Sequence, residues 1–218
     1  PSTEEFLKAF KEANAEHIVV LPNNSNIVLT ARQAADMAKI KCKSSMKAFY
    51  KKAGIATAPY YLVKDLAGCK RFIKKVGFPV VAKPDNGVGA SCTYKLKSDD
   101  DLADFLNNKR EWEVRYIMEE FIHAEVNSYD AIFNSNGDPI FETGNVTPMS
   151  IMDIVNDNDN SIYYIQKDLP EDTRAAGRAT AKSFGVKNRF VHFEFFRLTQ
   201  DQESMGKKGA VVALEVNM

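Results

Sequence analysis

A hydrophobic strand leads into a glycine-rich loop over residues 78–91, which read Phe78-Pro79-Val80-Val81-Ala82-Lys83-Pro84-Asp85-Asn86-Gly87-Val88-Gly89-Ala90-Ser91. Two glycines among small residues let a backbone approach a phosphate closely and direct its N–H groups toward it. Lys83, at the end of the incoming strand, could add a fixed ammonium group to the same phosphates. The loop lacks the Gly-Lys-Ser/Thr of a Walker motif, and taken alone it is explained equally well by a plain hairpin with an exposed lysine.

A second polar group lies near the end of the chain, where acids interrupt two hydrophobic segments. Glu194 lies in the middle of one segment, and Glu215 and Asn217 lie two residues apart in the other. Residues two apart on a strand share a face, and Glu194 could lie opposite them across a hairpin. Two carboxylates and an amide are hard oxygen ligands, which suit Mg²⁺ or Mn²⁺ and do not suit zinc. Solvated acids on an antiparallel pair are the alternative, but apolar strands penalise three such groups together.

Three weaker patterns also contain polar residues. Lys43, Lys47 and Lys51 recur every four residues and share a helix face, which is either solvated or supplied with an anion; periodicity alone favours solvent. The segment Tyr116–Ile122 sets two acids among apolar residues where a strand ends, and could offer backbone groups and an apolar wall to a purine, although a plain strand end is the commoner arrangement. His192, two residues before the first metal candidate, is either a polar partner on that face or a packed core histidine.

Composition limits the classes of function. The chain has 218 residues with 29 Lys+Arg and 29 Asp+Glu, so no net charge attracts nucleic acid or an anionic membrane. No segment approaches the roughly 20 apolar residues of a membrane span, and the N-terminus shows no signal-peptide core. The three cysteines are widely spaced and odd in number, which favours reduced thiols. We therefore expect a soluble cytoplasmic α/β protein that binds neither nucleic acid nor membrane.

Hydrophobic periodicity and turn residues predict helices and strands that alternate at first, with consecutive strands later. The predicted helices span residues 2–13, 30–40, 44–52, 66–76, 98–107 and 171–184. The predicted strands span residues 17–21, 60–63, 79–83, 92–96, 115–121, 127–134, 140–146, 190–198 and 211–216. The first of these strands is expected to be short and buried, and residues 135–139 to form a hairpin turn.

Taken in order, the lysines, the glycine loop, the Met118–Ile122 segment and the Glu194…Glu215-x-Asn217 pattern resemble the ATP-grasp superfamily over roughly residues 41–218. The carboxylate–amine ligase branch, near carbamoyl-phosphate synthetase and biotin carboxylase domains, looks most similar. The resemblance implies an α/β (α+β) fold whose two lobes, with antiparallel sheets, sandwich the nucleotide after a short βα remnant. It divides the chain into an N-terminal α-β-α segment (1–42), a lid lobe with the glycine loop (43–122) and a metal-binding lobe (123–218).

The resemblance also implies roles for individual residues. Lys43 or Lys47, with Lys47 preferred, is the first phosphate-binding lysine, and Lys83 is the second. The other implied nucleotide ligands are Asn86, Gly87, Gly89, Ala90 and Ser91 over the β- and γ-phosphates, Glu119 at the adenine amino group, Glu120, Phe121 and Ile122 in the adenine hinge, and Glu125 at the ribose. Glu194, Glu215 and Asn217 would hold one or two Mg²⁺ or Mn²⁺ ions. His123 and Ala124 depart from the family pattern after the hinge. This departure affects the assignment of Glu125, which follows them, to the ribose.

The implied activity is that of a ligase with ATP, a small-molecule carboxylate and an amine as partners. ATP would convert the carboxylate into an acyl phosphate, which the amine would attack. A homodimer is kept as an option for the assembly. Residues from about 60 to 109 are expected to close over the nucleotide as a lid.

Two departures leave other functions open. The chain stops one residue after Asn217, before the arginine and glycine-rich turn usual in this branch, and a complete domain before the first lysine is missing. Instead, Val19–Ile27 resembles a segment of the fatty-acid/dihydroxyacetone kinase-like family, over about the first forty residues. The chain is therefore expected to be truncated at both ends or to be a fusion. The alternatives are an ATP-binding module without ligase activity and an ATP-grasp kinase.

Overall fold

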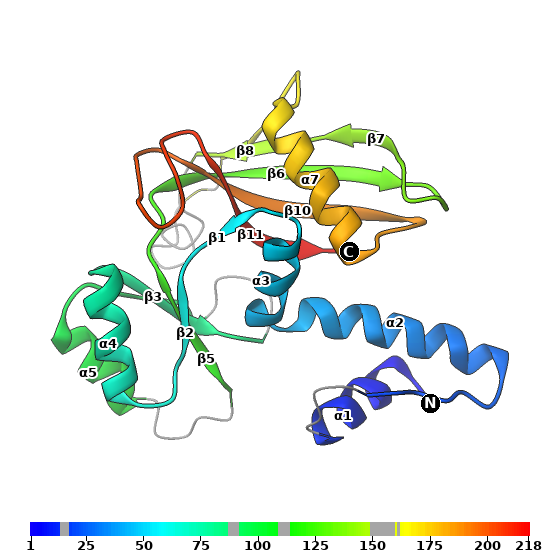
Figure 1. The fold of residues 1–218 in the computed structure, drawn as a ribbon, viewed down its shortest axis with the longest axis horizontal. Helices are drawn as coiled ribbons and strands as arrows, with labels where there is room; N and C mark the ends of the chain where they lie inside the picture. The colour runs from blue at the N-terminus through cyan, green and yellow to red at the C-terminus, as the bar shows by residue number, and fades with distance from the viewer. Residues whose placement is uncertain (14–17, 87–91, 109–113, 149–159, 161) are drawn as a thin grey trace.

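The structure is a computed structural model that describes residues 1–13, 18–86, 92–108, 114–148, 160 and 162–218. It contains two sheets, one of seven strands and one of four, flanked by helices (Figure 1). The larger sheet has the order β1 (Ala56–Thr57), β11 (Val211–Asn217), β10 (Arg189–Leu198), β6 (Ala124–Phe133), β8 (Asn145–Thr147), β9 (Tyr164–Ile165), and β7 (Pro139–Thr143) also pairs with β6. All its pairs are antiparallel except β1 with β11. The predicted α+β architecture of two largely antiparallel sheets is confirmed.

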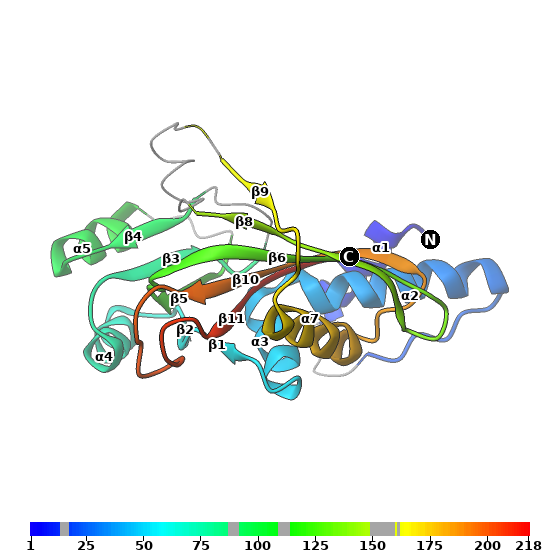
Figure 2. The ribbon, with the colours of Figure 1, turned by 90° about the horizontal axis from the view of Figure 1, so that it is seen from above.

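The core of the larger sheet lies on the face covered by α7 (Glu171–Phe184) and α3 (Lys43–Lys52), as Figure 2 shows. Alternate residues of the central strands point into it, among them the fully buried Tyr129 and Phe193. The rings of Phe49 and Phe184 stack 4.6 Å apart where the two helices meet. A Cβ atom on Gly177 would lie 2.2 Å from the Tyr129 ring, so only glycine lets α7 approach the sheet this closely.

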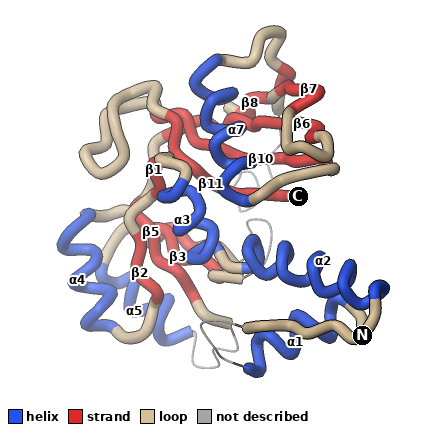
Figure 3. The backbone as a smooth tube through the Cα atoms, turned by 45° about the vertical axis from the view of Figure 1, so that its right-hand side comes forward, coloured by secondary structure: helices blue, strands red, loops and turns tan. Residues whose placement is uncertain are grey.

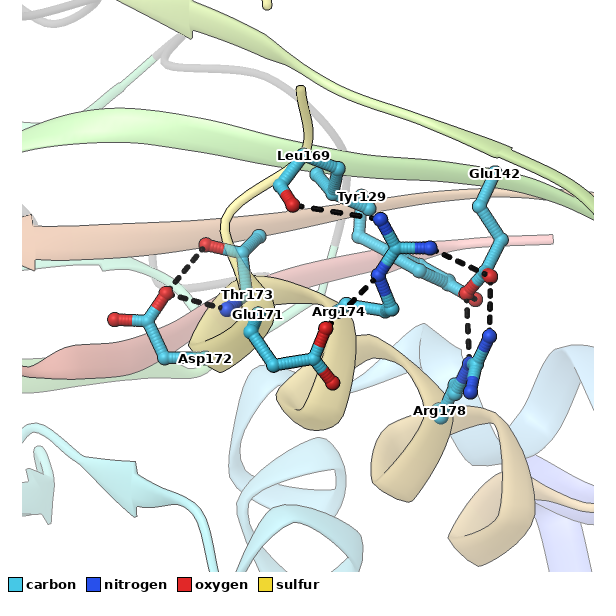
Figure 4. A network of polar contacts seen from close by, with 8 residues as sticks. All are labelled: Tyr129, Glu142, Leu169, Glu171, Asp172, Thr173, Arg174 and Arg178. Atoms are coloured by element: carbon cyan, nitrogen blue, oxygen red, sulfur yellow. Dashed lines mark hydrogen bonds and ion pairs between the residues drawn. The ribbon is translucent and has the colours of Figure 1, made fainter.

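A buried carboxylate ties strand β7 to helix α7 on the same face (Figure 4). Glu142 accepts hydrogen bonds from the Tyr129 hydroxyl at 2.6 Å and from Arg178 Nε at 2.9 Å, and Arg174 Nη1 lies 3.3 Å from it. The pKa of Glu142 is lowered chiefly by its hydrogen bond from Arg178. The carboxylate is therefore charged and fully used inside the fold, and we give this network a structural role.

The smaller sheet has the order β2 (Tyr60–Leu62), β5 (Tyr116–Glu120), β3 (Val80–Pro84), β4 (Tyr94–Leu96), and all its pairs are antiparallel. Helices α4 (Leu66–Val76) and α5 (Asp99–Asn108) close its hydrophobic core. Helix α4 begins at Asp65, whose side chain accepts from the Gly68 N–H at 2.6 Å, and ends at Gly77, which has a φ of 81°. On the opposite face of this sheet, Lys83 and Glu119 lie next to Lys47 of α3.

The N-terminal part consists of two packed helices, α1 (Thr3–Ala13) and α2 (Ser25–Lys41), side by side in Figure 3. The predicted buried strand at 17–21 is wrong over its described residues, 18–21, and with it the β element of the expected N-terminal remnant. Val19 and Leu21 are 82% and 87% exposed, and no strand lies beside them among the described residues. An apolar segment becomes a strand only where a neighbouring strand accepts its backbone hydrogen bonds.

Two further expectations concern the cysteines and possible membrane-spanning helices. The three cysteines form no disulfide, and Cys69 is buried while Cys92 is exposed. Among the described residues, no helix is long and apolar enough to cross a bilayer.

Candidate functional site

Two lysines share one buried carboxylate between α3, β3 and β5. Lys47 Nζ lies 2.7 Å from Glu119 Oε1, and Lys83 Nζ lies 2.5 Å from Glu119 Oε2. The three side chains are only 9–14% exposed. Burial alone would raise the pKa of Glu119, but the two ammonium groups lower it to about 2. Burial lowers the pKa of Lys47, and its attraction to Glu119 opposes that decrease. The group is therefore an ionised triad carrying one net positive charge.

The hairpin of β10 and β11 brings the candidate metal ligands together. Glu194 is the direct cross-strand partner of Glu215, and His192 is the partner of Asn217. The expected pairing of these residues across the hairpin is therefore confirmed as geometry. A bulge follows Glu194, where the register of the two strands shifts by one residue.

The lysines and the acids lie close enough to shift one another's pKa values. Burial raises the pKa of Glu215, Lys43 opposes the increase, and Glu194 adds to it. Burial lowers the pKa of Lys43, while Glu215 raises it and Lys83 lowers it further. Lys43 therefore lies near both the Glu194–Glu215 pair and Lys83. Charged groups about 170 residues apart in sequence thus act on one another electrostatically.

His192 lies beside the acid pair and makes polar contacts on both sides. Its Nδ1 lies 2.5 Å from Asp130 Oδ1, and its Nε2 lies 3.5 Å from Glu194 Oε1. The hydrogen bond with Asp130, followed by that with Glu194, raises the pKa of His192 to about 10. The side chain is 41% exposed. Of the two interpretations of this histidine, the structure supports the polar partner and excludes the packed core residue.

The donor set fits a hard divalent cation. No group of three or more His, Cys, Asp or Glu side chains suited to a metal occurs in the part of the chain that the structure describes. Two carboxylates and one amide are nevertheless what Mg²⁺ accepts when phosphate oxygens and water complete its octahedron. The Tyr50 hydroxyl is buried without a described hydrogen-bond partner, and its pKa is raised by burial and by Glu215 and Glu194. Lys43 and His192 offset only part of the charge of the two half-buried carboxylates, since the pKa of Glu215 stays raised, and a divalent cation would offset more of it.

The start of the glycine loop is fixed to the helix that carries the first lysines. Asp85 is fully buried; its carboxylate accepts from the Ser44 N–H and hydroxyl, each at 2.8 Å, and from Arg115 Nε at 3.0 Å. Asn86 accepts from the Cys42 thiol at 2.7 Å. Asp85 thereby caps α3 from outside the helix and holds Lys43 and Lys47 beside the loop. The other predicted loop ligands, Gly87, Gly89, Ala90 and Ser91, lie outside the described residues.

The predicted adenine hinge is held by the connection between β10 and β11. Gln202 is 9% exposed and uses its whole amide: Oε1 accepts from the His123 N–H at 2.8 Å, and Nε2 donates to the Phe121 carbonyl at 3.0 Å and to Glu120 at 3.2 Å. The Ser204 hydroxyl donates to Glu120 at 2.6 Å. This connection therefore determines the backbone path of the hinge.

Three predicted nucleotide residues have surroundings that the sequence did not suggest. Glu119, expected at the adenine amino group, has its carboxylate on the two lysines. Glu125, expected at the ribose, is the cross-strand partner of Arg197. Ile122 packs against the hydrophobic cluster that contains Leu198 and Met205. Their roles toward a nucleotide stay predictions.

Sequence reasoning did not identify Asp85, Arg115, Gln202 or Ser204. Each of them forms a hydrogen bond with a residue at least 30 positions away in sequence. Two of them, Gln202 and Ser204, also lie in a loop of ordinary polar composition. The one local signal was Asp85 itself, an acid placed between a strand and a glycine loop.

A known family and curated proteins each resemble a limited stretch of the chain. The C-terminal family model of FakA-like fatty acid kinase proteins matches residues 1–48. A D-alanine–D-alanine ligase of Clostridium botulinum (strain Alaska E43) is 34% identical over 84 residues, which are 38% of this chain and 28% of the ligase. The chain thus spans less than a third of this curated relative.

Solved structures resemble nearly the whole chain. The biotin carboxylase domain of Hydrogenobacter thermophilus 2-oxoglutarate carboxylase, solved as a dimer with MgADP and bicarbonate, has a TM-score of 0.68 at 18% identity; the match covers 99% of this chain and 50% of that one. The Bacillus anthracis D-alanine–D-alanine ligase with ATP has a TM-score of 0.60 at 20% identity, covering 84% of this chain and 56% of the ligase. At these identities the similarity establishes a shared fold.

Proposed function

Because the chain has the ATP-grasp fold, we propose that it binds Mg-ATP and forms the core of a ligase that activates a carboxylate for attack by an amine. The observation that carries this proposal is the meeting of Lys43, Lys47 and Lys83 with the Glu194–Glu215 pair in one electrostatic unit. Separate solvated surfaces, the alternative for each motif alone, do not account for cations and acids that are buried against each other.

The lysines would bind the phosphates. The triad of Lys47, Lys83 and Glu119 carries one net positive charge, and Lys43 adds a second next to Glu215. Ammonium groups fixed in a partly dry site stabilise charge on phosphoryl oxygens without reorganising at the moment of transfer. Asn86 and the loop 87–91 would cover the β- and γ-phosphates, and the segment 120–122 would contact adenine, with Glu125 near the ribose.

Glu194, Glu215 and Asn217 would hold Mg²⁺, or Mn²⁺ in its place. When bound, the cation would withdraw charge from the transferred phosphoryl group. His192 and Asp130 would orient the Glu194 side of the site through the contacts described above.

The reaction needs no protein nucleophile. A carboxylate oxygen of the substrate attacks the γ-phosphorus, the bond to the β-phosphate oxygen breaks, and ADP leaves. The amine then attacks the acyl carbon, inorganic phosphate departs with the C–O bonding electrons, and the amine loses a proton to solvent. The contribution of the chain is to position the reactants and stabilise the developing charge.

We propose the lobe division 43–122 and 123–218, with 1–42 as an additional N-terminal segment, and closure of the small lobe over the nucleotide. The four-stranded sheet with α4 and α5 supports a separate lid. Helix α3 shifts the boundary between the two lobes toward the lid, because its Met46 and Tyr50 are buried in the core of the larger sheet. The rigid body of the lid would therefore begin after β1, near residue 60.

The proposal is tested by trapping the activated carboxylate. The chain is incubated with Mg-ATP, a panel of carboxylates and hydroxylamine, and hydroxamate and ADP are measured. We expect ADP and hydroxamate in equal amounts, and none with Lys83→Met. ADP with a stable phosphorylated product would instead identify a kinase, and nucleotide binding without ADP would identify a binding module.

A further inference from the structure

On the face of the larger sheet opposite α7, three successive rows of cross-strand neighbours change from acidic to apolar along the strands. The first row pairs Glu215, Glu194 and Ser128 across β11, β10 and β6. The second row contains Asn217, His192, Asp130 and Thr143, and the third contains Phe190, Ile132 and Phe141. This face lies opposite α7, so the third row is no part of the described core.

The third row exposes more apolar surface than a strand face in water usually does. Phe190 is 73% exposed and Phe141 is 56% exposed, although they flank the same residue, Ile132. Three adjoining apolar side chains on three neighbouring strands form a continuous patch, and such patches commonly mark binding sites.

A cavity joins this patch to the candidate metal site. Its volume is about 520 Å³, and its lining includes Asn217 and His192 at one end and Ile132, Phe141, Phe190 and Met218 at the other. Pockets of this size with mostly apolar walls and a few polar groups at one end hold small molecules. The polar end is the end at which phosphoryl transfer would occur.

We propose that this cavity binds the carboxylate substrate, and that the substrate carries an apolar alkyl or aryl body. This inference rests on the proposed function. The carboxylate would lie beside Asn217, and the apolar body would run along β10 toward Phe190. Phe190 is four residues from Glu194, or about 13 Å along the strand, which a two-carbon acid cannot span.

The charges around the cavity favour one carboxylate and disfavour a second. Asp130 is the acid nearest the apolar row, and its Oδ1 is used by His192. A dicarboxylate would bring its far charge against Phe190 and Phe141, where the described lining contains no lysine or arginine to compensate its desolvation. We therefore expect the site to prefer octanoate to both acetate and succinate.

The test measures binding, so that it does not depend on turnover. The chain is first titrated with adenylyl imidodiphosphate and Mg²⁺, and octanoate, octanamide, acetate and succinate are then titrated into the complex by calorimetry. Octanoate should bind at least about tenfold more tightly than acetate, because its alkyl chain is buried. Octanamide, which has the same chain without the charge, should also bind more weakly than octanoate.

The variants Phe190→Ser and Phe141→Ser should each weaken octanoate binding about fivefold to tenfold and leave nucleotide binding unchanged. Both side chains are exposed, so neither change opens a cavity in the core. Ile140→Ser is the matched control: Ile140 is 66% exposed and next to Phe141 on β7, but it is the unpaired residue of a bulge, does not line the cavity and should have no effect.

The outcomes separate the two proposals. Normal nucleotide binding with equal affinities for octanoate and acetate would overturn this inference and leave the proposed function standing. Equal losses in Phe190→Ser and Ile140→Ser would also overturn it. Loss of nucleotide binding in the parent chain would overturn the proposed function and this inference with it.

Discussion

Glu194 and Glu215 face each other directly across the β10–β11 hairpin, although 20 residues separate them in sequence. Like charges in this position destabilise a sheet by up to about 1 kcal/mol when nothing compensates them. Lys43 offsets part of the repulsion, but the pKa of Glu215 stays raised by its burial and by Glu194. A cation held between the two carboxylates would offset the remaining repulsion, as the proposed function requires.

The variant Glu215→Gln tests this arrangement. A raised carboxyl pKa means that the charged form is disfavoured in the folded state, so the neutral amide should leave the metal-free protein as stable as the parent or more stable by up to about 1 kcal/mol. The same change should abolish the thermal stabilisation by Mg²⁺ and an ATP analogue. A variant that unfolds at a lower temperature yet keeps the Mg²⁺ effect would contradict the assignment.

Lys83→Met removes one of the two cations held by Glu119. We expect the dissociation constant for Mg-ATP analogues to increase by roughly 10- to 100-fold, as when one charged hydrogen bond to a phosphate is lost. Lys64→Met is the control, since Lys64 is exposed between β2 and α4. Equal nucleotide affinity in the two variants would remove Lys83 from the site.

The ion pairs of Glu119 predict a pH dependence of stability. Its folded pKa of about 2 lies below the ordinary value of 4.5, so its contribution is fully present above about pH 4.5 and is lost as the pH falls toward 2. By linkage this contribution is on the order of 3 kcal/mol. Urea unfolding of the parent and of Glu119→Gln should differ most at pH 7, and the difference should shrink toward pH 3. A difference that stays constant over this range would exclude the ion-pair account.

The amide of Gln202 predicts a selective effect on the adenine end of the site. Gln202→Leu keeps most of the side-chain volume but removes three hydrogen bonds to the hinge residues 120–123. The affinity for an ATP analogue should fall about tenfold, while the affinity for inorganic triphosphate with Mg²⁺ should change little. Glu203→Ala, at the exposed neighbouring position, is the control. Equal losses for ATP analogue and triphosphate would show that Gln202 acts on the whole fold.

Local patterns were sufficient for the elements whose signals lie within their own residues. Helices 66–76 and 171–184 have the predicted bounds, because a capping residue or a following glycine ends each one. Polar residues two apart on an apolar strand were enough to place Glu215 and Asn217 on one face opposite Glu194.

The features that were missed depend on distant partners. Strands β1 and β9 are two residues long, too short to show any periodicity, and exist because β11 and β8 pair with them. The apolar residues 18–21 have strand composition but no adjacent strand among the described residues. Asp85 and Gln202 are ordinary polar residues until the fold brings them to α3 and to the hinge.

The most direct test of the central claim is a calorimetric titration of the chain with adenylyl imidodiphosphate, with and without Mg²⁺, beside the double variant Glu215→Ala/Asn217→Ala. If lysines and acids form one Mg-nucleotide site, the parent chain should bind the analogue in a Mg²⁺-dependent manner and the double variant should lose that dependence. Binding of equal strength with and without Mg²⁺, or kept in full by the double variant, would contradict the claim.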